Sequence, residues 1–128
     1  MYQEEEYHTI RIEIFSPPET RNDEVRFIAD GIDLIGRHWS EMMGLSPDDV
    51  LKEPCRLRGA ATPLSVTIAR CGCGFKSCAS VEVTIQRSQD QVVWECAECT
   101  DTGQPAKLYF PASTYDAEVE RALRSRTL

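Results

Sequence analysis

The chain has 128 residues, of which 41% are hydrophobic and 27% charged, and its formal net charge is -7 at pH 7. These proportions are those of a globular domain with a modest core, which argues against wholesale disorder. The acidic balance argues against unaided binding to a nucleic-acid backbone, because that needs clustered lysine and arginine. No run approaches the roughly 18 consecutive apolar residues of a membrane helix.

Residues 1–7 are expected to be a disordered acidic leader, and residues 8–128 to form a single domain. The opening is acidic and has neither the positive charge nor the apolar run of a secretory signal peptide. We therefore expect a cytoplasmic protein. In that compartment clustered cysteines more often bind metal or carry out redox chemistry than form structural disulfides.

The first third of the chain predicts two strands and a turn. Residues 8–15 carry isoleucine at alternate positions, which is the period of a half-buried strand. Residues 25–29 predict a second strand, and the Asp-Gly pair at 30–31 is typical of a hairpin turn. Residues 33–43 repeat apolar side chains at steps of three and four, which predicts a helix that Gly44 would end as a left-handed cap.

The rest of the chain alternates short elements. Ser46 is a candidate N-cap for a short helix, with Pro47 in its first turn. The expected elements are that helix at 47–52, a loop at 53–63, strands at 64–70, 81–86, 92–96 and 107–110, and a helix from 113 onward. Strands, helix, strands and helix in this order predict an α+β fold with a mainly antiparallel sheet, a central helix and a C-terminal helix.

Five of the six cysteines lie between residues 71 and 99, in the spacings C-x-C-x4-C and C-x2-C. Thiolates in such short turns are common ligands of tetrahedral Zn(II). If residues 88–91 close a hairpin, Arg87 lies opposite Val92 and Ile85 opposite Trp94, and the second group returns to the first. The expected ligands of a structural zinc site at this end of the hairpin are Cys71, Cys73, Cys78 and Cys99, with Cys96 as the alternate ligand.

The choice between Cys96 and Cys99 depends on the register. In the expected pairing Cys96 faces the apolar side, where a free cysteine packs as a small hydrophobe, and a one-residue bulge would reverse the choice. Two other readings stay open: buried cysteines without a metal, and a redox pair formed by Cys96 and Cys99. Cys55 stands alone in a loop and is expected to be incidental.

No catalytic motif is found. A closed site of four thiolates would be structural, because catalytic zinc keeps one position open for water. There is no glycine-rich phosphate loop, G-x-S-x-G elbow or H-E-x-x-H pair. His8 and His38 are expected to be packed or surface side chains, so we expect no enzymatic activity.

The chain resembles a loose group of small uncharacterised bacterial proteins, often from actinobacteria. The likeness covers about residues 25–123 and rests on the Asp-Gly turn, the C-x-C-G-x3-C turn at 71–78, the Val-Val-Trp strand at 92–94 and the Tyr-Asp start of the last helix. This chain adds Cys96 and Cys99 to that pattern. The resemblance implies no particular reaction.

These observations predict a small non-enzymatic protein, stabilised by zinc, that acts through protein contacts. Its acidity suits a basic partner, as for a toxin-neutralising immunity protein, because complementary charge speeds the encounter. A thiol-redox or metal-handling protein is one alternative. A zinc-ribbon-like nucleic-acid-binding module is the other, with Arg56, Arg58 and Arg70 as a small basic patch.

Overall fold

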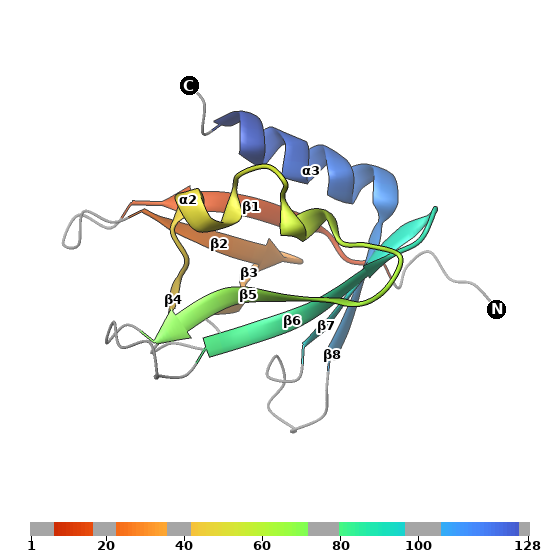
Figure 1. Cartoon of the computed structure of the whole chain (residues 1–128), viewed down its shortest axis with the longest axis horizontal. Coiled ribbons are helices and arrows are strands. Elements are labelled where there is room, and N and C mark those ends of the chain that lie inside the picture. The colour runs from red at the N-terminus through yellow and green to blue at the C-terminus, as the bar shows by residue number, and fades with distance from the viewer. Residues whose placement is uncertain (1–6, 17–22, 36–41, 72–79, 97–105, 126–128) are drawn as a thin grey trace.

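The computed structural model of the chain describes residues 7–16, 23–35, 42–71, 80–96 and 106–125, which form two antiparallel sheets and a long C-terminal helix (Figure 1). The three-stranded sheet has the order β1 (Ile10–Phe15), β2 (Glu24–Ala29), β3 (Ile32–Asp33). The five-stranded sheet has the order β4 (Met42–Gly44), β5 (Leu64–Cys71), β6 (Ser80–Arg87), β7 (Gln91–Cys96), β8 (Ala106–Pro111). The helical elements are α2 (Pro47–Val50), the 3-10 helix η2 (Arg56–Arg58) and α3 (Ala112–Ser125). The predicted α+β class is confirmed.

Local sequence signals explain most of these elements. Asp30 and Gly31 have φ angles of 51° and 81°, as a hairpin turn between two right-twisted strands requires. Ser46 caps α2, because its hydroxyl accepts a hydrogen bond of 3.2 Å from the backbone N–H of Asp48. The predicted hairpin register is confirmed, with Arg87 opposite Val92 in the β6–β7 pair.

In the predicted helix over residues 33–43, Leu34 and Ile35 are helical and residues 36–41 lie outside the described part of the chain, but the expected end is wrong. Residues 42–44 form strand β4, in which Gly44 lies opposite Ala69 of β5. Gly44 does not have the positive φ of a left-handed cap. A Cβ at this position would instead lie 2.3 Å from the carbonyl oxygen of Val25. The glycine is therefore required by the close approach of β4 to β2.

The two sheets are hydrogen-bonded to each other at two places. On one side the N–H of His8 donates to the carbonyl oxygen of Tyr109 at 2.7 Å, just before β1 begins. The N–H of Tyr109 donates in return to Nδ1 of His8 at 3.1 Å. On the other side the N–H of Val25 in β2 donates to the carbonyl oxygen of Leu45 at 2.9 Å. The sheets thus enclose one common core.

Aromatic side chains fill the centre of this core. Trp94 is fully buried, with Phe27, Phe110 and Tyr115 around it at ring-centroid distances of 5.4 to 6.4 Å. These edge-to-face contacts add to the area that each ring buries. Nε1 of Trp94 donates to the hydroxyl oxygen of Tyr115 at 3.0 Å, so the polar edge of the indole is also satisfied.

Helix α3 lies over β1 in Figure 1 and buries Tyr115, Val119 and Ala122. It also protects the edge of the three-stranded sheet. The N–H of Ile12 in β1 donates to Oε2 of Glu118, and Nη2 of Arg121 donates to the carbonyl oxygen of Ile12, both at 2.6 Å. An edge strand covered in this way offers fewer free backbone groups to another chain.

No helix among the described elements has the length and apolarity to cross a membrane.

Candidate functional site

Strands β5 and β7 stop, and β6 and β8 begin, along the same edge of the five-stranded sheet (Figure 1). Cys71 is the last residue of β5, and Cys96 is the last residue of β7. Arg70 pairs with Ser80 and Cys96 with Ala106, so the end of β5 lies beside the start of β6, and the end of β7 beside the start of β8. We call this region the cysteine end. Five of the six cysteines of the chain lie at it or in the segments that follow its strands.

The predicted zinc ligands are only partly described. Cys73, Cys78 and Cys99 lie outside the described residues, and only the backbone of Cys71 is described. Within the described ranges, no group of three or more His, Cys, Asp or Glu side chains could hold a metal ion. The four-thiolate site therefore stays a prediction. What the strands contribute to it is the common position of their ends.

Cys96 is described in full. Its side chain is 0% exposed and packs in the core, on the face that the hairpin register predicted. Its sulfur is disulfide-bonded and is not a free thiol. A sulfur in a disulfide offers no thiolate to a metal, so disulfide formation and zinc binding compete for cysteines in this part of the chain.

Cys55 lies in an irregular segment between α2 and η2, as the sequence predicted, and its free thiol is buried in the core. Its side chain is 6% exposed, and Sγ donates to the carbonyl oxygen of Val50 at 3.4 Å. Burial raises the pKa of the Cys55 thiol. A protonated, enclosed thiol is a poor nucleophile, so Cys55 acts as a packing residue.

The two histidines were expected to be packed or surface residues, and His38 lies outside the described residues. His8 uses its backbone N–H and Nδ1 to join the two sheets at Tyr109. Its ring also packs edge-on against Phe110, with 6.3 Å between the ring centroids. His8 thus has a structural role in closing the fold.

The three arginines of the suggested basic patch lie apart. Arg58 donates to Glu53 and pairs with Glu120, both at 2.6 Å, so its charge is balanced. Arg56 hydrogen-bonds to Ser65, early in β5. Arg70 lies five residues further along that strand, a separation of about 16 Å at 3.3 Å per residue. The described structure does not gather these side chains into one surface.

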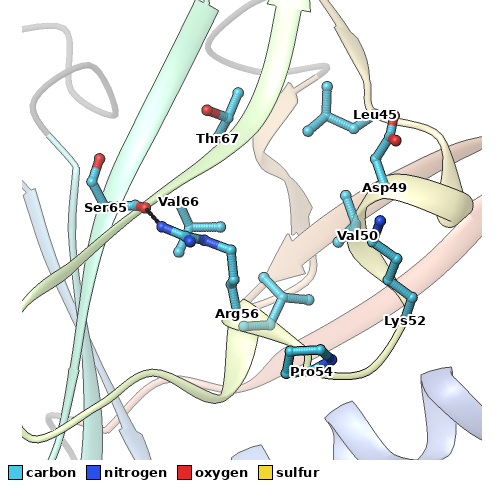
Figure 2. A pocket seen from close by; sticks show the side chains of 10 residues that line it. Leu45, Asp49, Val50, Lys52, Pro54, Arg56, Ser65, Val66 and Thr67 are labelled. Atoms are coloured by element: carbon cyan, nitrogen blue, oxygen red, sulfur yellow. Dashed lines mark hydrogen bonds between the residues drawn. The ribbon is translucent and has the colours of Figure 1, made fainter.

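A second candidate site is a pocket of about 270 Å³ between α2, η2 and β5 (Figure 2). Its apolar lining comes from Leu45, Val50, Pro54, Leu57 and Val66. Sequence reasoning missed it because these residues come from three segments that have no common motif. The one available signal is Leu57, an apolar residue between two arginines in a segment otherwise typical of a loop.

Polar side chains complete the pocket. Its polar lining consists of Asp49, Lys52, Arg56, Ser65 and Thr67. Nη2 of Arg56 donates to the carbonyl oxygen of Ser65 at 2.8 Å, which holds the guanidinium against β5. Figure 2 shows Arg56 on the β5 side and Lys52 on the α2 side, with the apolar side chain of Val50 between them. An apolar interior with a few polar groups at its border is the usual form of a small-ligand site.

Comparison of the chain with protein-family models, with curated proteins and with solved structures gives no match.

Proposed function

We propose that the chain is a small non-enzymatic cytoplasmic protein that acts by binding another protein, and that a structural Zn(II) stabilises its cysteine end. The supporting observation is that the antiparallel register ends β5 and β7 at the same end of the sheet. The proposed ligands are Cys71, Cys73, Cys78 and Cys99. A closed four-thiolate site would hold these segments together and leave no position for a reacting water.

The proposed partner is a basic protein. The net charge of -7 supports this choice, because opposite charge steers diffusional encounter. Glu82 and Glu95 are exposed on the outer face of β6 and β7, where they can contribute to such steering. An immunity protein that neutralises a basic toxin is one concrete form of this function. It predicts a neighbouring gene for a basic toxin-like protein and a complex that weakens as salt rises. Absence of both would count against that form.

Metal content tests the zinc proposal directly. Protein purified under reducing conditions is expected to contain one zinc ion per chain, as measured by elemental mass spectrometry. Cys71→Ser and Cys99→Ser should each lose most of that zinc. Cys55→Ala is the matched control, because Cys55 lies in the core away from the cysteine end, and it should keep the metal. A metal content near zero in the parent protein would refute the zinc site.

The second candidate is a thiol-redox or metal-handling protein, and the disulfide at Cys96 favours it. In that case two thiols at the cysteine end would form one disulfide and pass two electrons and two protons to an oxidant such as glutathione disulfide, giving two molecules of glutathione. Thiol counting after exposure to a series of glutathione ratios separates the two functions. Reversible loss of two thiols together with zinc release would support the redox function. A zinc site that resists the oxidised buffer would support the structural one.

A further inference from the structure

We propose that the pocket between α2, η2 and β5 binds a small aliphatic monocarboxylate, with its carboxylate at Arg56 and its hydrocarbon part on the apolar floor. The proposal does not depend on the zinc site or on the protein partner. It rests on the size of the pocket, on the side chains that form its floor, and on two cations that form no ion pair with a carboxylate of the described residues.

The size of the pocket limits the ligand. A volume of about 270 Å³ corresponds to roughly nine waters at their liquid volume. An acid of six or seven carbon atoms fills such a space, whereas a nucleotide or a long fatty acid does not. Small ligands of this size bind weakly, so a dissociation constant on the order of 1 mM is expected.

The floor of the pocket is apolar and held in place from below. The side chains of Val50, Leu57 and Val66 are buried and turn their remaining surface to the pocket. The carbonyl oxygen of Leu57 accepts the hydrogen bond of Tyr115 from α3. The floor is therefore formed before any ligand arrives, which lowers the entropic cost of binding.

The charges around the pocket favour an anion. Elsewhere in the described chain Arg11, Arg26, Arg58, Arg87 and Arg121 each have a carboxylate within 3.0 Å. By contrast, neither Lys52 nor Arg56 has an ion pair with any described carboxylate, although the chain is strongly acidic. The Nη2 group of Arg56 donates to the neutral carbonyl of Ser65. Its remaining N–H groups suit a carboxylate, which can accept two of them side by side.

Asp49 favours a ligand with one carboxylate over a ligand with two. It also lines the pocket, and Figure 2 shows it beside Leu45 on the side opposite Arg56. Two cations and one carboxylate give the lining a net charge of about +1, which fits a single negative charge. A carboxylate at Arg56 lies away from Asp49, whereas a second carboxylate on the ligand would be driven towards it. A monocarboxylate is thus preferred over a dicarboxylate.

Calorimetric or NMR titration of the full chain at pH 7 tests the proposal with 4-methylpentanoate as the probe. Saturable binding is expected, with the NMR shifts centred on Val50, Leu57 and Val66. The amide 4-methylpentanamide has the same shape without the charge, and it should bind at least about tenfold more weakly. An adipate titration should also give weaker binding. Equal binding of acid and amide, or no saturation with the acid, would overturn the proposal without any substitution in the protein.

Substitutions then assign the anion site. Arg56→Gln should weaken 4-methylpentanoate binding by about tenfold, and Lys52→Gln by a smaller factor. Lys107→Gln is the matched control, because Lys107 is an exposed cation on β8 outside the pocket, and its binding should equal that of the parent chain. All three side chains are exposed, so unchanged thermal melting is expected for each. If Arg56→Gln and Lys107→Gln bound the acid equally well, Arg56 would not be its receptor.

Discussion

The hydroxyl group of Tyr115 donates a hydrogen bond of 2.5 Å to the carbonyl oxygen of Leu57, a residue 58 positions earlier in the chain. The same oxygen atom of Tyr115 accepts from Nε1 of Trp94 at 3.0 Å. One buried phenol therefore connects α3, η2 and β7. It satisfies a buried donor and a buried acceptor that would otherwise have no partner, and it supports the floor of the pocket.

Tyr115→Phe keeps the ring and removes both hydrogen bonds. The carbonyl of Leu57 and the indole N–H of Trp94 then stay buried without partners. We expect the unfolding free energy to fall by about 2–6 kcal/mol, because each of these two groups costs about 1–3 kcal/mol. Denaturant titration measures this as a lower midpoint with an unchanged slope. Tyr109→Phe is the matched control, since Tyr109 is half-buried on β8, and it should change stability by less than about 0.5 kcal/mol.

The same phenol predicts a stability change in alkali. Burial raises the pKa of Tyr115 above its ordinary value of 10, and the hydrogen bond from Trp94 does not offset this. Above about pH 10 the unfolded chain loses this proton more readily than the folded one. The contribution of Tyr115 to stability is thus complete below about pH 10 and decreases as the pH rises. Tyrosinate absorbance followed against pH should show one of the four tyrosines ionising only when the chain unfolds. Ionisation of all four while the fold is intact would contradict the burial of Tyr115.

The sequence predicts elements that depend on neighbours in the chain. Alternation along β6 and a four-residue turn were enough to place Arg87 opposite Val92, because a one-residue slip would expose Val83 and Ile85. The cap at Ser46 was likewise predictable, since it needs only the residues of its own turn.

Elements that depend on distant neighbours were not predictable. Residues 42–44 have apolar spacing compatible with a helix, but pairing with β5 and contact with β2 make them a strand. In β5 the register shifts between Thr67 and Ala69, so Ile68 and Ala69 are both buried, which simple alternation does not predict.

The candidate sites divide in the same way. The hairpin register brings the strand ends of the cysteine end together, and this part follows from the sequence. The pocket could not be predicted, because Val50, Arg56 and Val66 meet only after α2, η2 and β5 have packed together. The loop position of Cys55 was predicted correctly but its burial was not, since the burial of this loop depends on contacts made elsewhere.

The contact between Glu118 and Ile12 predicts a contribution to folding stability that depends on pH in the acid range. Burial alone would raise the pKa of Glu118, but hydrogen bonds from Arg121 and from the N–H of Ile12 outweigh it and leave the pKa below its ordinary value of 4.5. The contribution is therefore complete above the unfolded-state pKa and is lost as the pH falls through the folded-state value. Glu118→Gln should lower the unfolding free energy by about 1–2 kcal/mol at pH 7.

The difference between Glu118→Gln and the parent chain should shrink as the pH falls through the lowered pKa of folded Glu118, where the parent carboxylate also becomes neutral. Chemical unfolding at several pH values checks this. Glu95→Gln, on the exposed outer face of β7, is the control and should leave stability nearly unchanged at each pH. A difference for Glu118→Gln that does not shrink at all as the pH is lowered would show that the charge of Glu118 does not matter.

The approach of β4 to β2 predicts that Gly44 tolerates no side chain. In Gly44→Ala the added Cβ would lie 2.3 Å from the carbonyl oxygen of Val25, so one of the two strands has to move. That movement would disturb two hydrogen bonds, from Val25 to Leu45 and from Gly44 to Glu24, each 2.9 Å long. We expect the unfolding free energy to fall by about 3 kcal/mol, at the upper end for an overpacked site.

Gly31→Asn is the matched control, since nothing lies within 4 Å of a Cβ there and asparagine accepts positive φ. It should cost less than about 1 kcal/mol. Equal thermal shifts for the two variants would mean that β4 and β2 do not approach each other this closely.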